Sequence, residues 1–309
     1  MKKEHVLFLR NRPAEFNLGD FLCTPLHYLD FNVIEHQSGF FLKGKQYKTI
    51  LGGGAFNDLG VSQHVEHLST VAWGVGSSIH GADSLPSNAD NLPFLRYGVR
   101  DIDATSDPKK VLPCVTCLHP IVQTVAGAET GVFLNYDSKI TSRTFFDKSA
   151  IEKKYNVNLF TNNLDEWEFM KAFERHGRII TNSFHVAYWS LLSGREVAII
   201  GYSSKFRSLL KLFNLDTSLI NHYDVKTQEK LIDTIGMIMD SQTFVTSLNF
   251  KENRNDFIGR NMNFAQECVN IGFLPSVELK PHNYNNILTR KLKYKALQTA
   301  VSLFNKIKN

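Results

Sequence analysis

The stretch RIITNSFHVAYWSLLSGREVAIIGYSSKFRSLL, from Arg178 to Leu210, alternates short β-branched runs with apolar helical patterns. RIITNSF and EVAIIGY favour buried strands, whereas HVAYWSLLSG and KFRSLL have the spacing of helices. Such alternation is typical of an α/β fold with largely parallel sheets. The stretch therefore predicts two strand-helix units, and it puts His185 at the point where the first strand passes into its helix.

The same alternation extends in both directions from this stretch. On the N-terminal side we expect strands over 5–10, 48–54, 69–78 and 94–101, and a helix over 19–30. On the C-terminal side we expect strands over 131–137 and 155–162, and helices over 164–176, 227–241 and 255–272. Two successive α/β series predict two Rossmann-like, doubly wound domains that face each other across a cleft.

The length of 309 residues also favours two domains, because one core rarely grows so large. We expect an N-terminal domain over 1–125, a C-terminal domain with the His185 motif over 126–285, and a separate segment over 286–309.

A hydrophobic content of 43% and a charged content of 21% are ordinary globular values. The net charge of +5 permits acidic ligands such as phosphates, and we expect no nucleic-acid partner.

The two ends of the chain bear on its location. The N-terminal MKKEHVLFLRNRP has an apolar run too short for a signal peptide, and no stretch approaches the ~20 apolar residues of a membrane span. A cytoplasmic protein is expected.

Residues 286–309 predict a basic amphipathic helix, with six Lys or Arg and no acidic residue from Arg290 onwards. This helix either docks on the body with its lysines in water or also contacts an anionic membrane surface.

The four cysteines, Cys23, Cys114, Cys117 and Cys268, fit reduced thiols better than a disulfide framework. CVTC contains a pair with zinc-ligand spacing, but the chain has no second pair, and Cys23 and Cys268 look isolated. We therefore expect no metal site and treat these side chains as small buried apolar groups.

Residues that follow the N-terminal strands form the first set of candidate ligand contacts, because ligands bind beyond the carboxyl ends of parallel strands. They are Asn17, Gly19, Asp20, Gly52, Gly53, Gly54, Gly76, Ser77 and Arg100. Asp20 is expected to cap a helix, alone or together with a role in ligand binding. The glycine loops allow close approach of the backbone to a ligand. Arg100 can clamp a carboxylate or phosphate; the alternative is a surface turn with Asp101.

The C-terminal half supplies the second set, Asn182, Ser183, His185, Ser204 and Lys205. Asn182 and Ser183 are expected to cap the helix that His185 begins. A histidine there suits proton transfer near neutral pH; the alternative is a hydrogen-bonded core histidine. A lysine at a helix N-terminus is electrostatically misplaced unless an anion lies between them, so Lys205 indicates a bound anion. The alternative for Lys205 is a solvated side chain.

The order of these motifs resembles the polysaccharide pyruvyl transferase family. Its motifs are matched by N-x-G-D at 17–20, the GGG strand end, GVGSS, VRD, and T-x-S-F-H followed by an apolar helix and YSSKF, over about two thirds of the chain. The resemblance implies a GT-B-like fold of two Rossmann-type domains. It also implies transfer of the enolpyruvyl unit of phosphoenolpyruvate to sugar hydroxyls of a bacterial surface glycan or its lipid-linked precursor. Phosphoenolpyruvate is then the donor co-substrate, with no other cofactor, at the inner membrane face.

The resemblance maps the family's histidine onto His185, its cleft lysine onto Lys205 and the arginine of VRD onto Arg100. Many members carry an arginine where this chain has Ser183, so a carboxylate clamp is missing unless other cations replace it. Two other functions share the expected architecture. One is a glycosyltransferase that uses a nucleotide sugar, and the other is a non-catalytic partner in glycan assembly.

Overall fold

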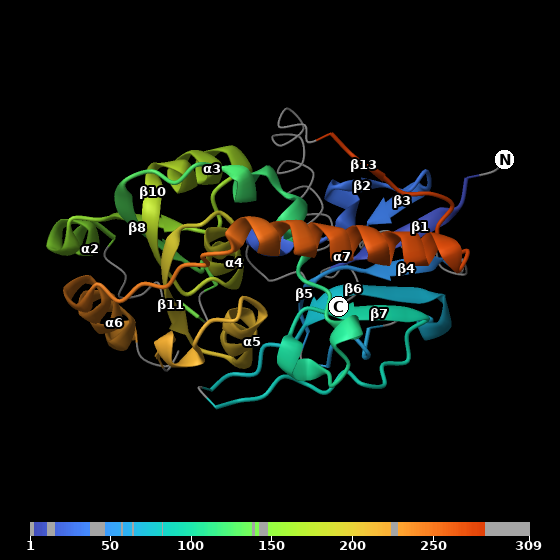
Figure 1. Ribbon diagram of the computed structural model, residues 1–309, viewed down its shortest axis with the longest axis horizontal. Helices are drawn as coiled ribbons and strands as arrows, with labels where there is room; N and C mark the ends of the chain where they lie inside the picture. Colours follow the sequence, from blue (N-terminus) through green and yellow to red (C-terminus); the bar gives the residue numbers. More distant parts are fainter. Residues whose placement is uncertain are drawn as a thin grey trace, which may run out of the picture.

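Two parallel β-sheets form the framework of the protein (Figure 1). The computed structural model describes residues 3–10, 16–37, 47–56, 58–63, 65–81, 83–137, 140–141, 148–223 and 228–281. The first sheet contains, in spatial order, β3 (Ile34–Gln37), β1 (His5–Leu9), β4 (Lys48–Leu51), β6 (Thr70–Gly76) and β5 (Gly54–Ala55), with β7 (Arg96–Val99) also paired to β6. The second contains β12 (Asn221–His222), β11 (Glu196–Gly201), β10 (His176–Thr181), β8 (Glu129–Leu134) and β9 (Asn158–Thr161). All strand pairs described in these two sheets are parallel, so the predicted α/β class is confirmed.

The two sheets share one strand order. If the main strands are numbered along the chain within each sheet, both sheets have the order 2-1-3-4-5; the two-residue strand β5 is left out. This order reverses direction between strands 1 and 3, which are β1 and β4 in the first sheet and β8 and β10 in the second. In open parallel sheets, ligands bind outside the carboxyl ends of the strands at such a reversal. In each sheet the topology therefore predicts a ligand site at the carboxyl ends of the two strands on either side of this reversal.

Seven α-helices and seven short 3₁₀ helices are present in the described residues. The α-helices are α1 (Leu18–Leu22), α2 (Lys148–Tyr155), α3 (Glu166–Arg175), α4 (Phe184–Leu192), α5 (Ser204–Leu212), α6 (Gln228–Ser241) and α7 (Phe250–Asn270). The 3₁₀ helices are η1 (Pro25–His27), η2 (His67–Ser69), η3 (Ile102–Ala104), η4 (Pro108–Lys110), η5 (Val115–Leu118), η6 (Pro120–Gln123) and η7 (Thr217–Leu219). A two-residue antiparallel pair joins β13 (Glu278–Leu279) to β2 (Leu29–Asp30).

The interior strand β1 of the first sheet is buried on both faces, as its sequence pattern requires. Alternate residues of a strand point to opposite faces, and in β1 Val6 and Phe8 belong to one core cluster whereas Leu7 and Leu9 belong to another. All four side chains are buried. A parallel strand covered on both faces reads as a continuous apolar run, which is why HVLFL has no polar alternation.

The helix expected over 19–30 is wrong. The chain forms α1 for five residues, then the 3₁₀ helix η1, and then strand β2. Pro25 is the cause, because a proline disfavours helical backbone at the residue before it, and Thr24 is extended at φ −120° and ψ 138°. Helix α1 therefore ends at Leu22 and brings Cys23 to its C-terminus.

Helix α7 packs against both sheets. Phe257 near its middle belongs to the core cluster of the second sheet, whereas Phe264, Ala265 and Cys268 pack with strands of the first. Figure 1 shows this helix running lengthwise from one sheet to the other. Trp73 of β6 donates a hydrogen bond to Asn261 Oδ1 at 2.9 Å and fixes the helix to the first sheet.

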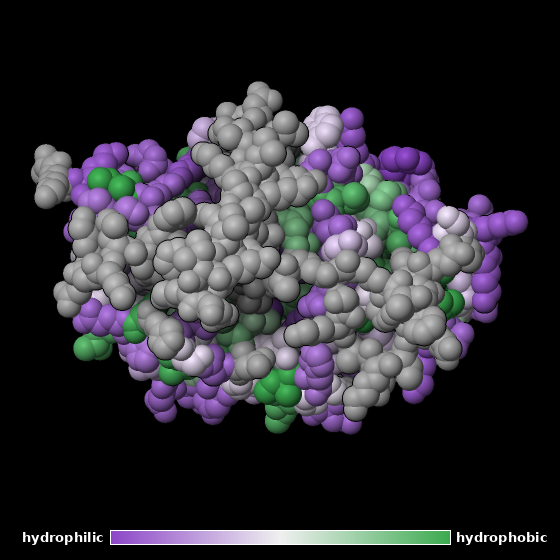
Figure 2. Space-filling model, turned by 180° about the vertical axis from the view of Figure 1, so that it is seen from behind, coloured by the Kyte–Doolittle hydropathy of each residue, from purple (hydrophilic) through white to green (hydrophobic). Residues whose placement is uncertain are grey.

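The chain passes from one sheet to the other between Val99 and Glu129. This interval contains the predicted domain boundary at 125/126, and the division into domains stays a prediction. The basic amphipathic helix predicted over 286–309 lies outside the described residues. Within the described part of the chain, no helix is both long and apolar enough to cross a membrane. Figure 2 shows hydrophilic residues over most of the described rim of the face opposite to that of Figure 1.

We expect Asn261→Leu to lower the free energy of unfolding by about 2–4 kcal/mol, because it leaves buried polar groups without partners. Asn261 is fully buried, and its Nδ2 also donates to the Pro113 carbonyl at 3.1 Å. Urea denaturation followed by tryptophan fluorescence measures the change. Gln266→Ala, on the exposed side of the same helix, is the control and should stay within about 0.5 kcal/mol of the unsubstituted protein. Equal effects of the two substitutions would contradict the assigned role of Asn261.

Candidate functional site

A polar pocket lies at the carboxyl ends of both sheets. It is lined by Asn17, Asp20, Ala55, Ser78, His80, Arg100, Asn135, Asp137, Ile140, Ser183, Phe184, His185, Tyr202 and Lys205. Ala55 ends β5, and the other residues follow β1, β6, β7, β8, β10 and β11, so residues far apart in the sequence share one space. The pocket has a cavity volume of about 200 Å³, which is smaller than the roughly 300–1,000 Å³ of sites for drug-sized ligands.

Arg100 is a buried cation with unused hydrogen-bonding capacity. Its side chain is 2% exposed, and neither Nε nor Nη1 has a hydrogen-bond partner in the described structure. Asp101 Oδ1 lies 3.7 Å from Nε, and the guanidinium stacks over the Phe184 ring at 4.1 Å. Burial opposes the charge of Arg100, but Asp101 and other nearby groups outweigh that effect and raise its pKa. The alternative of an Arg100–Asp101 surface turn is wrong, because both residues are buried.

Lys205 is a second buried cation in the same pocket. It is the second residue of α5, it is 7% exposed, and its Nζ donates a hydrogen bond to Tyr202 Oη at 2.6 Å. Burial, followed by the positive charge of Arg100, lowers the pKa of Lys205 to about 8. The alternative of a solvated lysine is therefore wrong. Burial also raises the pKa of the Tyr202 phenol, so this hydroxyl stays protonated and can donate in turn.

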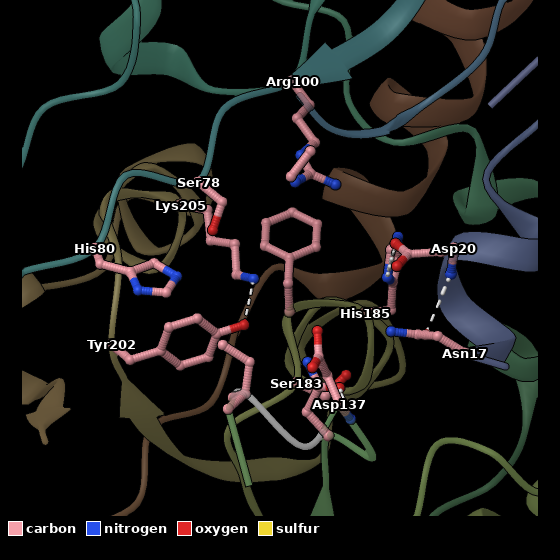
Figure 3. A pocket seen from close by; sticks show the side chains of 14 residues that line it. Asn17, Asp20, Ser78, His80, Arg100, Asp137, Ser183, His185, Tyr202 and Lys205 are labelled. Atoms are coloured by element: carbon pink, nitrogen blue, oxygen red, sulfur yellow. Dashed lines mark hydrogen bonds and ion pairs between the residues drawn. The ribbon is translucent and has the colours of Figure 1, made fainter. Parts of the chain in front are cut away.

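His185 faces the cations from another wall. Figure 3 shows Lys205, Tyr202 and His80 on one side of the pocket, and His185 with Asp20 and Asn17 on the other. His185 Nδ1 lies 3.8 Å from Asp20 Oδ1, and Nε2 lies 3.1 Å from the Cys23 sulfur. The residue is 4% exposed, so the pocket is its route to solvent and to ligands.

Helix α1 brings the residues of the N-x-G-D motif to His185. Asn17 is the N-cap, because its side chain accepts a hydrogen bond from the Asp20 amide at 3.3 Å. The expectation that Asp20 caps the helix is therefore wrong; its carboxylate lines the pocket instead. The Leu18 amide donates to the Asn162 carbonyl at 2.8 Å, which ties the start of α1 to the second sheet.

The turn TNSFH is held by side chains that do not cap α4. Thr181 Oγ1 donates to the Phe133 carbonyl at 2.5 Å and accepts from the Ser183 amide at 2.9 Å. Asn182 Oδ1 accepts from the Asn135 amide at 2.7 Å and thereby fixes the loop after β8. Ser183 occupies the N-cap position of α4 without a capping hydrogen bond from its side chain. The expected capping by Asn182 and Ser183 is wrong, because these residues brace the neighbouring strand ends.

The glycines make room for functional side chains. A Cβ atom added to Gly19 would lie 2.3 Å from His185 Nδ1, and one added to Gly76 would lie 2.1 Å from Arg100 Nε. One added to Gly53 would lie 2.8 Å from the Cys23 sulfur. The glycine loops thus allow close approach, as expected, but of the protein's own side chains.

Six of the predicted site residues line the pocket: Asn17, Asp20, Arg100, Ser183, His185 and Lys205. The others, Gly19, Gly52, Gly53, Gly54, Gly76, Ser77, Asn182 and Ser204, lie behind its lining. The Ser77 amide donates to Asp101 Oδ2 at 2.5 Å, and Ser204 Oγ accepts from the Ile79 amide at 3.3 Å. These two serines therefore fix the loops that carry the pocket residues.

Five polar lining residues were not predicted as site residues: Ser78, His80, Asn135, Asp137 and Tyr202. His80 follows the strand predicted over 69–78, and the others lie at the C-terminal ends of predicted strands, so position at a strand end was the available signal. His80 forms an isolated bridge with Ser203, which joins the loop after β6 to the start of α5. Burial, and then the charge of Lys205, lowers the pKa of His80.

The cysteines also depart from expectation. Cys23 is not isolated, because its sulfur lies 3.4 Å from that of Cys114, a residue 91 positions away. The other cysteine of CVTC, Cys117, contacts Asn261 Nδ2 at 3.5 Å. The four thiols described are free and buried.

Anion binding should depend on the space at Gly76. We expect Gly76→Ala to displace the Arg100 side chain and to weaken sulfate binding by about tenfold or more, the loss typical of a charged hydrogen bond. Isothermal titration with sulfate measures the affinity, and circular dichroism verifies folding. The control is Gly259→Ala, whose added Cβ meets no atom within 4 Å. Unchanged sulfate affinity in Gly76→Ala would refute this role of Arg100.

Anion binding should also weaken as pH rises through the pKa of Lys205, about 8, because the amine loses its charge there. Sulfate keeps its charge of −2, Arg100 stays protonated, and the lowered pKa of His80 leaves that ring neutral. The sulfate affinity should fall about tenfold between pH 7 and pH 9. Lys205→Met should bind more weakly at pH 7 and lose most of the pH dependence. An equal pH dependence in both proteins would contradict the assignment.

Comparison with known proteins adds no assignment to this geometry. No protein-family model matches the chain, and neither does any curated protein or solved structure.

Proposed function

We propose that the protein is a pyruvyltransferase that moves the enolpyruvyl group of phosphoenolpyruvate to sugar hydroxyls of a bacterial surface polysaccharide or its lipid-linked precursor. The product is a pyruvate ketal. The observation that carries the proposal is the presence of two buried cations, Arg100 and Lys205, in one pocket with His185. The order of the sequence motifs supports the same function.

The charge pattern of the pocket suits this donor. Phosphoenolpyruvate carries a phosphate and a carboxylate, and a buried cation without a counter-ion is costly, so each anionic group would offset part of that cost. Arg100 can bind through the N–H groups of Nε and Nη1, which have no partner in the described structure, whereas Lys205 acts as a point charge at the start of α5. Ser183 replaces an arginine of many family members, and Arg100 and Lys205 compensate for it in this assignment.

The reaction needs one proton donor and a site for two hydroxyls. Protonation of the methylene carbon of phosphoenolpyruvate makes the neighbouring carbon electrophilic. One sugar hydroxyl attacks that carbon, inorganic phosphate leaves, and a second hydroxyl closes the ketal. Of the two hydroxyl protons, one replaces the proton added to the methylene and the other leaves with phosphate, so the balance closes without another reactant.

His185 is the proton-transfer group in this scheme. We assign the exchange of protons to Nδ1, which lies on the side of Asp20 and the pocket. The Asp20 carboxylate lies 3.8 Å from Nδ1, on the side from which the ring would donate its proton. Tyr202 and Lys205 then face the leaving phosphate, and the hydroxyl of Tyr202 remains a hydrogen-bond donor.

The architecture belongs to the same proposal. The two sheets would be the cores of two Rossmann-type domains in a GT-B-like arrangement, with the pocket in the cleft between them. The acceptor would be a lipid-linked glycan at the cytoplasmic face of the inner membrane, where the basic segment 286–309 would contact anionic lipid. No nucleic acid takes part.

The decisive experiment compares the surface glycan of cells that carry the wild-type gene, His185→Gln or His222→Gln. Mass spectrometry should detect pyruvate ketals in the wild-type glycan and about a 100-fold decrease or more in His185→Gln, the loss expected for a general acid-base group. His222 is exposed and does not line the pocket, so His222→Gln is the matched control and should retain the ketals.

Two results would overturn the function. The first is a wild-type glycan without pyruvate. The second is saturable binding of a uridine or guanosine diphosphate in calorimetry, together with no binding of phosphoenolpyruvate; this outcome would support a nucleotide-sugar glycosyltransferase instead.

A further inference from the structure

A cluster of two thiols and one imidazole lies directly behind the pocket. Cys23 ends α1, Cys114 precedes η5, and His185 belongs to the first turn of α4. The Cys23 sulfur lies 3.4 Å from the Cys114 sulfur and 3.1 Å from His185 Nε2. All three donor atoms lie within 4.8 Å of one another. Three segments that are distant in the sequence thus bring soft ligand atoms together.

The spacing of these atoms fits a tetrahedral metal ion. With metal–sulfur bonds of about 2.3 Å and a metal–nitrogen bond of about 2.0 Å, tetrahedral ligands lie about 3.8 Å apart for two sulfurs and about 3.5 Å apart for sulfur and nitrogen. The Cys23–Cys114 and Cys23–His185 separations need to open by only a few tenths of an ångström to reach these values, and the Cys114 sulfur lies within 4.8 Å of the His185 ligand nitrogen. Because His185 also lines the pocket, an ion can enter through it.

The groups around the cluster supply a second, independent observation. A histidine that binds a metal usually has its other ring nitrogen next to a carboxylate, and Asp20 Oδ1 lies 3.8 Å from His185 Nδ1. The Arg100 guanidinium interacts electrostatically with Cys23, Cys114 and Asp20. Two thiolates would balance the charge of a divalent cation, so the metal ion and its two cysteine ligands would together be neutral.

We propose that Cys23, Cys114 and His185 form a binding site for a thiophilic divalent cation, with Zn²⁺ as the best match to two sulfurs and one imidazole. Binding releases the protons of the two thiols, and the fourth coordination position is left for water or a ligand oxygen. We assign Asp20 as a positioning residue in this site, because its carboxylate lies on the Nδ1 side of the His185 ring, opposite to the nitrogen that would bind the metal.

Occupation of the site has a consequence that rests on the proposed function. A metal on Nε2 uses the lone pair of that nitrogen, and Nδ1 then holds the remaining ring proton beside Asp20. The ring can no longer become the imidazolium that donates a proton to phosphoenolpyruvate. Zn²⁺ would therefore inhibit the pyruvyl transfer.

The binding test uses the full chain, metal-free and kept reduced with a phosphine. Titration with Zn²⁺ against a chromogenic chelator should give one ion per wild-type chain. Cys23→Ser and Cys114→Ser should each weaken binding by about 100-fold or more, because a serine hydroxyl is a poor ligand for soft metals. Asp20→Asn should weaken it by about tenfold. The matched control is Cys117→Ser, which removes the neighbouring buried thiol of CVTC and should leave the affinity unchanged.

A spectroscopic measurement covers the case in which a cysteine variant does not fold. Co²⁺ added to the wild-type protein should give intense sulfur-to-cobalt charge-transfer absorption and the visible bands of a tetrahedral ion. Absence of these bands, or no competition by the protein for Zn²⁺, would refute the site. An equal loss of affinity in Cys117→Ser and Cys23→Ser would refute it as well.

Release of phosphate from phosphoenolpyruvate separates this inference from the proposed function. The acceptor in this assay is a membrane extract from cells that make the glycan. If the metal-free wild-type protein releases phosphate and loses this activity when Zn²⁺ is added, the result supports both the metal site and the pyruvyl transfer. Activity with no Zn²⁺ binding refutes only the metal site, whereas Zn²⁺ binding with no activity at any metal level refutes only the pyruvyl transfer.

Discussion

Two buried cations in one pocket, Arg100 and Lys205, are the constraint on which the rest of the site depends. Burial of a charge costs several kcal/mol unless an opposite charge or hydrogen bonds offset it. Asp101 offsets only part of the cost at Arg100, because it lies 3.7 Å from Nε and makes no hydrogen bond to it. Lys205 has one neutral partner, Tyr202, and its pKa falls to about 8. A bound anion would therefore offset the cost of burying both charges, and the two cations are already in place to receive it.

The parallel topology explains how the fold tolerates the free-energy cost of burying these two cations. Strand ends of both sheets converge on the pocket, and their interiors are packed on continuous apolar cores. Those cores supply the stability that a polar pocket lacks. Helix α7 contributes to both of them and thereby holds the first sheet in place beside the second. The small residues Gly19 and Gly76 complete the arrangement, because any side chain there would occupy the positions of His185 and Arg100.

Part of the candidate site could be predicted from the sequence. The residues and contacts that were missed share a physical cause, which is that they depend on tertiary structure. His185 and Lys205 were found because each begins a helix directly after a strong strand pattern, where the local sequence alone fixes the position. Asp137 and Tyr202 are the last residues of predicted strands, but an acid or a tyrosine at a strand end has many ordinary explanations. The approach of Cys23 to Cys114 spans 91 positions and depends on where Pro25 ends α1, which no periodicity reports. The sequence likewise could not show that the glycines make room for other side chains, because this role depends on tertiary contacts.

His185 connects the two proposals, and its surroundings show why they exclude each other at any one moment. Its two nitrogens face different chemistry, with a carboxylate near Nδ1 and a thiol near Nε2. Proton transfer requires that the ring alternate between its neutral and charged forms, whereas metal binding holds it neutral with one lone pair in use. A thiol is a weak donor and acceptor that leaves the ring free to change its charge, but a pair of thiolates is a strong metal ligand. Metal binding releases the protons of the Cys23 and Cys114 thiols, so occupation of the site by a metal ion decides which of the two chemistries the imidazole can carry out.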